Sequence, residues 1–250
     1  KKVTSIAGMT NIAAAKRTLL EENFEVGAVP PSDLMKSVDG TIKYLYPAGP
    51  GNFVESVYIP TEDRATLCVS SQVGCKMNCL FCMTGKQGFT KNLSANEILN
   101  QIQSLPETEE LTNIVFMGMG EPLFNYDNLI KSIHILRDRN GLNFPTDGIN
   151  VSTVGPVEQL KRLREEHLKI QFTLSLHATD QATRNMIMPH MKSNSIHSVV
   201  EAALSYSARH NRKLTSAYLL APGINDRASD VRQLGKWFRG KNVLINLLQY

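Results

Sequence analysis

The sequence predicts an α/β fold in which a helix follows each strand of one parallel sheet. From about residue 65 onward, short apolar segments rich in Val, Ile and Leu alternate with helical patterns. Segments of this kind are typical of strands that are covered on both faces. Six such alternations imply that the helical connections between successive parallel strands all have the same handedness. The spacing alone fits either an open doubly wound sheet or a partial barrel, and 250 residues with 42% hydrophobic content suffice for its core.

The six predicted strands are short and apolar, and they cover residues 65–70, 113–117, 149–153, 170–176, 214–220 and 243–248. The helices between them begin at residues that suit a helix start. Ser94 and Glu97 have the spacing of a capping box before the apolar residues Ile98 and Ile102. By the same reasoning, later helices are expected to begin at Asp127, Pro156, Ser195, and either Asp226 or Ser229.

Residues 1–60 have a different pattern: a short helix at 13–22, a proline pair at 30–31, and two strands at 42–46 and 53–59. We interpret them as the last part of an N-terminal accessory domain that leads into a core domain of residues 61–250. The chain begins without an initiator methionine or a secretory leader, so we expect its natural start to lie further upstream.

No apolar segment approaches about 20 residues, the length that crosses a bilayer, so no membrane contact is expected. Four cysteines are too few for a disulfide framework in a chain of this length, and unpaired thiols predict the reducing cytoplasm. The net charge is +4, and the basic excess lies in residues 61–250 because residues 1–60 are balanced. This charge permits a polyanionic partner without requiring one.

The most informative local feature is the CxxxCxxC motif formed by Cys75, Cys79 and Cys82. Three thiolates on one loop can hold three irons of a 4Fe–4S cubane and leave the fourth iron without a protein ligand. The amino and carboxylate groups of S-adenosylmethionine can chelate that open iron. Phe81 precedes the last cysteine, the position from which an aromatic ring commonly rests on the adenine of this cofactor.

Structural zinc is the main alternative, with Cys68 as a fourth thiolate. Zinc sites, however, usually consist of two separated cysteine pairs, each on its own turn. Here three cysteines share one loop, and Cys68 lies inside a predicted strand. The spacing therefore favours the iron–sulfur cluster.

Polar residues follow the predicted strands at the edge where parallel α/β folds bind ligands. Gly120 and Glu121 follow the second strand and can accept hydrogen bonds from an ammonium group. Ser152 and Ser175 end the next two strands and can bind ribose hydroxyls or a carboxylate, while His177 can donate to a ribose. Each also has a plainer interpretation: an ordinary turn, a strand-end serine, or a core histidine.

Ordered motifs across nearly the whole chain resemble the RlmN/Cfr family of radical S-adenosylmethionine RNA methyltransferases. They are FVESVYIP at 53–60, DRATLCVSSQVG at 63–74, the cysteine motif at 75–82, QGF at 87–89, MGMGEP at 117–122, VSTVG at 151–155, SLHA at 175–178 and IND at 224–226. The resemblance implies a partial (β/α)6 barrel of the TIM type with a small N-terminal accessory domain.

The resemblance also implies roles for individual residues. The 4Fe–4S cluster would be held by Cys75, Cys79 and Cys82, and S-adenosylmethionine by positions matching Gly120, Glu121, Ser152, Ser175, Leu176 and His177. Glu55 falls on the position of the proton acceptor. Cys68 falls on the residue that forms a disulfide with a methyl-carrying cysteine near the C-terminus during turnover.

The implied reaction is methylation of C2 of an adenosine in 23S rRNA, and possibly in tRNA. One cofactor molecule methylates the carrier cysteine, and reductive cleavage of a second one generates the radical that activates this methyl group. An electron donor such as flavodoxin or ferredoxin is implied, and we expect a monomer. No cysteine follows Cys82, so we expect the carrier to lie beyond Tyr250 in the natural protein.

Three other functions fit parts of the sequence. A Cfr-like enzyme would methylate C8 of the same base. A radical enzyme acting on a small molecule or a peptide would keep the cluster and the cofactor without RNA. A zinc-stabilised RNA-binding module would have no catalytic activity.

Overall fold

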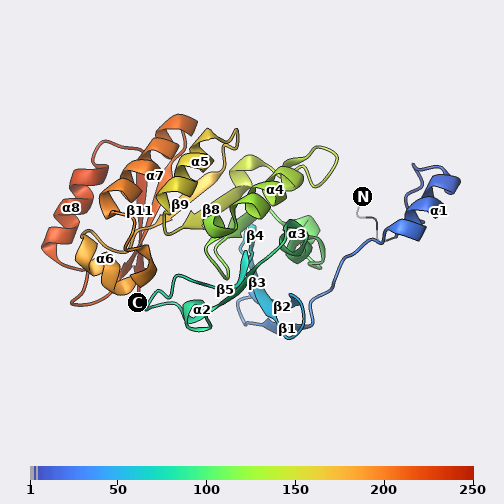
Figure 1. The fold of residues 1–250 in the computed structure, drawn as a ribbon, viewed down its shortest axis with the longest axis horizontal. Helices are drawn as coiled ribbons and strands as arrows, with labels where there is room; N and C mark the ends of the chain where they lie inside the picture. Colours follow the sequence, from blue (N-terminus) through green and yellow to red (C-terminus); the bar gives the residue numbers. More distant parts are fainter. Residues whose placement is uncertain (1–2, 4) are drawn as a thin grey trace.

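The computed structural model describes residue 3 and residues 5–250. Within them, nine strands form one sheet in the order β1-β2-β3-β4-β7-β8-β9-β10-β11 (Figure 1). The six strands from β4 onward run parallel and match the predicted strands to within two residues at each end. They are β4 (Ala65–Cys68), β7 (Asn113–Phe116), β8 (Ile149–Thr153), β9 (Gln171–Ser175), β10 (Leu214–Leu220) and β11 (Val243–Gln249). The predicted parallel α/β fold is therefore confirmed.

Three antiparallel strands extend the sheet on the β4 side: β1 (Asp33–Lys36), β2 (Ile42–Pro47) and β3 (Phe53–Pro60). β1 and β11 lie at opposite ends of the strand order, so the sheet does not close and the architecture is that of a partial barrel. Helix α1 (Ala14–Asn23) buries no residue and lies apart from the sheet at the end of an extended segment (Figure 1). The domain boundary near residue 60 stays a prediction.

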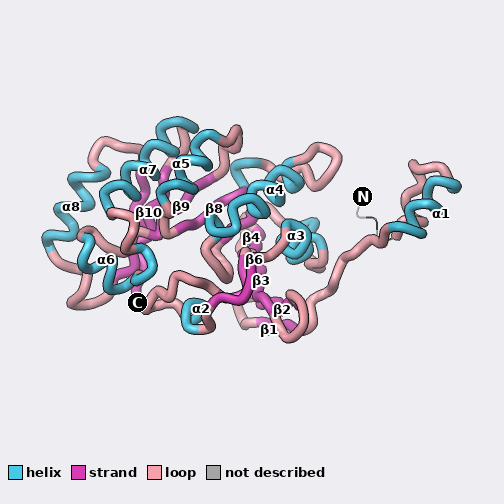
Figure 2. The backbone as a smooth tube through the Cα atoms, in the orientation of Figure 1, coloured by secondary structure: helices cyan, strands magenta, loops and turns pink. Residues whose placement is uncertain are grey.

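Helices follow the parallel strands, as Figure 2 shows in cyan beside the magenta strands. The longer ones are α3 (Ala95–Gln103), α4 (Tyr126–Arg137), α5 (Val157–Glu165), α7 (Ile196–His210) and α8 (Ala228–Phe238). Two short ones are α2 (Met83–Lys86) and α6 (Gln181–Ile187), and 3₁₀ turns occur at Thr108–Glu110, Pro122–Asn125, Thr146–Gly148 and Pro189–Met191. The sequence did not predict α6, which begins at Asp180, whose carboxylate accepts from the Thr183 N–H.

The predicted helix starts are confirmed at three helices: α3, α7 and α5, whose N-cap is Pro156. Ser94 and Glu97 form a reciprocal capping box, and the Ser195 hydroxyl accepts from the Ser198 N–H. For α8 the prediction was wrong, because its N-cap is Arg227, whose backbone N–H donates to Asp230 in the first turn. For α4 it was wrong too, because Asn125 and a 3₁₀ turn precede the helix and Asp127 lies inside it.

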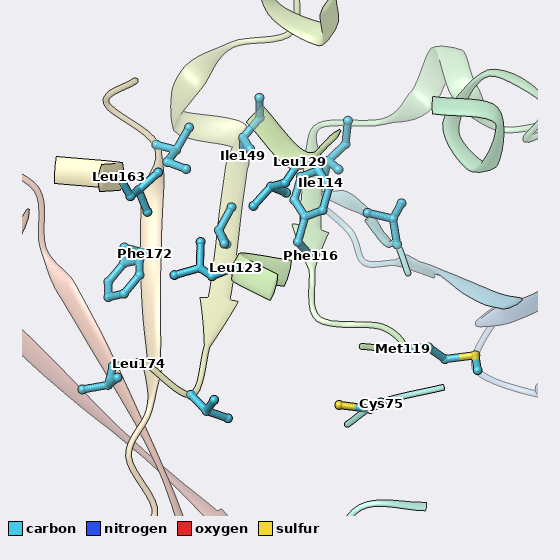
Figure 3. Close-up of a cluster of buried hydrophobic side chains, with 14 of the residues drawn as sticks. Cys75, Ile114, Phe116, Met119, Leu123, Leu129, Ile149, Leu163, Phe172 and Leu174 are labelled. Atoms are coloured by element: carbon cyan, nitrogen blue, oxygen red, sulfur yellow. The ribbon is translucent and has the colours of Figure 1, made fainter. Parts of the chain in front are cut away.

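One face of the sheet packs against the helices and forms the core. Ile114, Phe116, Leu129, Ile149 and Leu163 have no exposed surface, and Figure 3 shows them in one layer between strands and helices. Burying each such side chain contributes on the order of 1.5–3 kcal/mol. Along β3 and β4 buried and partly exposed residues alternate, so the side chains on the opposite face of these strands are partly exposed. This partly exposed face and the carboxyl ends of the strands surround the candidate site.

Candidate active site at the carboxyl ends of the strands

The cysteine loop follows β5 (Gln72–Gly74), which pairs with β6 (Phe89–Asn92). Gly74 has a φ of +71°, and a Cβ atom there would lie 1.9 Å from the carbonyl oxygen of Gly88. Only glycine permits this close approach, and it allows the Cys75 N–H to donate to that carbonyl at 2.7 Å. A glycine thus fixes where the cysteine loop begins.

The far side of the loop is bound to α6. The Leu80 N–H donates to the carbonyl of Ile187 at 2.9 Å, and Figure 1 shows the segment between β5 and α2 reaching across to α6. The loop therefore spans from the first parallel strand to the helix that follows the fourth. This position places its cysteines at the carboxyl ends of the strands.

Cys75, Cys79 and Cys82 are free thiols, and the first two are buried. Burial, together with smaller contributions from the nearby thiols of Cys82 and Cys75, raises the pKa of Cys79 to about 12. The three sulfurs therefore lie close enough to interact. A metal centre stabilises the thiolate form of such buried cysteines.

Among the residues that the structure describes, no three His, Cys, Asp or Glu side chains converge on the position of a single metal ion. A cubane is larger than one ion and spreads its thiolate ligands over a wider space. Thiolates are also the ligands that iron–sulfur clusters use. The donor set on this loop therefore fits a 4Fe–4S cluster with one open iron.

Cys68 lies on β4, apart from the cysteine loop. It pairs with Val57 on β3 and with Val115 on β7. Burial raises the pKa of its thiol to about 11. No disulfide is formed by any of the four cysteines in this structure.

The Gly118–Gly120 segment after β7 packs directly on the residues that precede the cysteine loop. A Cβ atom on Gly118 would lie 2.7 Å from the Val69 carbonyl oxygen, and one on Gly120 would lie 2.5 Å from Gln72. Gly120 also has a φ of +100°, which disfavours any other residue. These glycines bring the backbone of the second strand's loop against that of the first.

Glu121 is buried, and its carboxylate binds the end of β8. It accepts from the Thr153 hydroxyl at 2.6 Å, the Val154 N–H at 2.9 Å and the Leu123 N–H at 3.0 Å. Burial raises the pKa of this carboxyl group to about 7, although these three donors oppose the shift. Glu121 thus connects the loops after β7 and β8. This connection was not predicted, because nothing in the sequence associates Glu121 with Thr153.

Ser152 and Ser175 meet across two neighbouring strands, β8 and β9. Their hydroxyl oxygens are 3.2 Å apart, and both side chains are partly exposed. The structure therefore brings together two of the predicted cofactor-binding residues. Each hydroxyl keeps further capacity to donate or accept.

His177 follows β9 in the left-handed region, with a φ of +54°. Its Nδ1 accepts from the Leu219 N–H at 3.0 Å, so the neutral ring carries its proton on Nε2. Burial and the charge of Arg184 lower its pKa to about 3, which keeps the ring neutral at physiological pH. Phe81 meets the ring edge-on, with 5.0 Å between ring centroids. The cysteine loop and the end of the fourth parallel strand thus come into contact.

Asn225 is a buried residue whose role sequence reasoning missed. Its amide donates to the carbonyls of His177 at 2.7 Å and Leu219 at 2.6 Å, and its side-chain oxygen accepts from the Ala221 N–H. It therefore fixes the backbone of His177 in its unusual conformation. The only signal was the IND motif at 224–226, which carried no assigned role.

Glu55 and Cys68 lie on adjacent strands and share one face of the sheet. Glu55 is two residues from Val57, which pairs with Cys68, and side chains two residues apart point to the same face. Residues that pair on neighbouring strands point to the same face of a sheet. Following the pairs from Cys68 through β7 to β8 and β9 shows that Ser152 and Ser175 also point to this face. Glu55 is half exposed and forms an ion pair with Lys43 at 2.9 Å.

Comparison with known proteins gives consistent results. The family model of the radical SAM superfamily matches residues 69–234. A relative in Parabacteroides distasonis is 54% identical over 250 residues, covering 100% of this chain and 73% of the relative. Relatives in Bacteroides thetaiotaomicron and Pseudothermotoga lettingae are 49% and 42% identical and are covered to 72% and 73% of their lengths. All three bear the name probable dual-specificity RNA methyltransferase RlmN.

Comparison with solved structures gives the same result as comparison with the sequences. A radical SAM methyltransferase from Sphaerobacter thermophilus superposes with a TM-score of 0.90 at 33% identity, covering 98% of this chain and 74% of that one. The maturase HydG matches with a TM-score of 0.51 at 17% identity, a similarity of fold alone. Among the described residues, no helix is both long and apolar enough to span a membrane.

Proposed function

Since this chain belongs to the radical SAM superfamily, and within it to the RlmN family of RNA methyltransferases, we propose that it methylates C2 of an adenosine in 23S rRNA and in tRNA. The enzymes of this family use a 4Fe–4S cluster and S-adenosylmethionine. When bound, this pair supplies the radical that makes an otherwise unreactive carbon centre available for bond formation.

The observation that carries the proposal is the convergence of the cysteine loop on the ends of β7, β8 and β9. The contact between Phe81 and His177 joins the cysteine loop to β9. The bonds from Glu121 join β7 to β8. A cluster held by this loop would therefore lie beside the predicted cofactor-binding residues.

We assign the cofactor-binding roles accordingly. The three loop cysteines would hold the cluster, and the ring of Phe81 would contact the adenine. The hydroxyls of Ser152 and Ser175 and the Nε2–H of His177 would bind polar groups of S-adenosylmethionine, and Gly120 would offer its backbone groups. The backbone groups of Glu121 and Leu176 are bonded within the protein, so these two residues shape the site. Because both carboxylate oxygens of Glu121 already have protein partners, its main task is to hold two loops in place.

Glu55 and Cys68 are assigned to the later steps of the reaction. They share the sheet face toward which Ser152 and Ser175 also point, and the side chains of β3 and β4 on this face are partly exposed. A carboxylate there can accept the C2 proton of a base. Cys68 can form the disulfide that releases the methylated product, with a carrier cysteine that is not among the four in this chain.

The substrate base must leave its stack to reach such a site, which RNA enzymes achieve by binding an unpaired or extruded nucleotide. The basic excess of the chain suits a polyanionic substrate. We further propose that a flavodoxin or ferredoxin donates the electrons, that the protein acts as a monomer, and that its free cysteines reflect the reducing cytoplasm.

The proposal is tested with the natural full-length protein, reconstituted anaerobically with iron and sulfide. With a reductant and methyl-labelled S-adenosylmethionine, it should label 23S rRNA and tRNA transcripts, and nucleoside analysis should identify 2-methyladenosine. A product methylated at C8 would indicate the Cfr-like reaction. Cofactor cleavage without labelled RNA would favour a small-molecule or peptide substrate. Colourless protein with stoichiometric zinc would indicate the binding module.

Replacing Glu55 with glutamine is expected to stop the reaction after the RNA has joined the protein. The amide cannot accept the C2 proton, so a covalent protein–RNA adduct should accumulate and be visible as a shifted band on a denaturing gel. Glu62→Gln is the control, because Glu62 is an exposed carboxylate just beyond the same strand. Normal turnover by Glu55→Gln would refute the proton-acceptor role.

A further inference from the structure

Arg184 on α6 is a buried cation without an acidic partner. Its side chain has no exposed surface, and it takes part in none of the ion pairs of the described residues. One terminal nitrogen donates to the carbonyl of Leu176 at 2.6 Å, and the other to the carbonyl of Val154. The third group, Nε–H, has no hydrogen-bond partner.

Burying an unpaired charge is strongly unfavourable, and two neutral carbonyls offset only part of that cost. An unpaired buried N–H adds on the order of 1–3 kcal/mol. Such an arrangement is stable when an anion occupies the space beside the free N–H in the working protein. Arg184 therefore indicates that a negatively charged group belongs next to it.

The position of Arg184 identifies that group. The carbonyls it binds belong to residues just beyond the ends of β8 and β9, next to Ser152 and His177. Its helix is bonded to the cysteine loop through Leu80 and Ile187. Arg184 and Ile187 lie about one turn apart on α6, and Leu80 directly follows Cys79 in the cysteine loop, so the guanidinium group lies on the part of α6 that faces this loop.

A 4Fe–4S cluster with three thiolate ligands carries a net negative charge, and reduction adds one more. We propose that Arg184 is the buried counter-charge of this cluster, with its free Nε–H donating to the Cys79 sulfur or to a neighbouring sulfide. Arg184 is then a positioning residue that stabilises the reduced cluster and so raises its midpoint potential. The inference rests on the cluster site proposed above and not on the RNA substrate.

The test compares two substitutions of Arg184 in the reconstituted full-length protein. Arg184→Gln removes the charge and keeps a hydrogen-bond donor, whereas Arg184→Lys keeps the charge and loses the planar guanidinium group with its several N–H donors. Redox titration followed by EPR, without S-adenosylmethionine, should show a more negative midpoint potential for Arg184→Gln and a value close to wild type for Arg184→Lys. Arg162→Gln is the control, because it removes an exposed arginine that pairs with Asp127 on the outer helices.

Three results would overturn the inference: an unchanged potential in Arg184→Gln, an equal shift in both variants, or a loss of cofactor affinity alone, which would assign Arg184 to the cofactor carboxylate. A wild-type protein without any cluster would instead refute the proposed function. If neither variant folds, wild-type protein labelled with ¹⁵N-arginine decides the question. Electron–nuclear double resonance on its reduced cluster should detect a nitrogen coupling, and its absence would overturn the inference.

Discussion

Replacing Cys79 with alanine is expected to abolish cluster binding and, with it, cleavage of S-adenosylmethionine. Cys79 is the middle cysteine of the motif in the sequence, and its side chain is buried. Removing one of only three ligands leaves an iron without a protein ligand, so the cluster should be lost on gel filtration. The loss of cofactor cleavage should exceed roughly 100-fold, the upper range for residues that merely support a metal ligand. Iron analysis and the broad visible absorption of the reconstituted protein measure the effect.

Cys68→Ala is the matched control for this experiment. Cys68 lies on β4, outside the loop, so its loss should leave iron content and cofactor cleavage intact while blocking complete methylation. A Cys79→Ala protein that keeps its iron and colour would contradict the three-thiolate assignment. Equal metal loss in both variants would favour a four-thiolate zinc site.

Replacing Glu121 with alanine is expected to destabilise the protein and weaken cofactor binding. The change leaves the Thr153 hydroxyl and the N–H groups of Val154 and Leu123 without their acceptor in a buried site. An unsatisfied buried group costs about 1–3 kcal/mol, so the free energy of unfolding should fall by about 3 kcal/mol or more. Denaturant titration measures this loss, and calorimetric titration measures the affinity for S-adenosylmethionine.

Glu121→Gln should lie between wild type and Glu121→Ala. The amide oxygen can still accept from Thr153 and Leu123, but its NH₂ group faces the Val154 N–H. Glu158→Ala is the control, because Glu158 forms only an exposed ion pair with Lys161, worth at most about 1 kcal/mol. Wild-type stability of Glu121→Ala would show that the three contacts do not hold the loops together.

Much of the fold could be predicted because its signals are local. Each parallel strand is a short apolar segment with its own boundaries, and the capping box at Ser94 and Glu97 is formed within four residues. The α6 helix could not be predicted in this way. With seven residues it is too short to show a clear period, and its buried Arg184 resembles a surface residue in any hydropathy pattern.

The predicted start of α8 was wrong for a related reason. Asp226 and Ser229 are both suitable capping residues, and the sequence contains no information that favours either. In the structure, Asp230 binds the Arg227 backbone and side chain and also accepts from Thr179, 51 residues earlier in the chain. The start of this helix therefore depends on Thr179, a residue that is distant in the sequence.

The sequence by itself determined the chemistry of this protein: three thiols on one loop, the polar residues that follow successive strands, and the alternation of strands and helices along the chain. These features depend on residue type and on spacing over a few positions. The tertiary structure alone decided which polar groups meet: Phe81 with His177, Ser152 with Ser175, Glu121 with Thr153. It also left Arg184 buried with a free N–H. The physical reason is that buried polar groups must find partners, and packing chooses those partners from residues far apart in the chain.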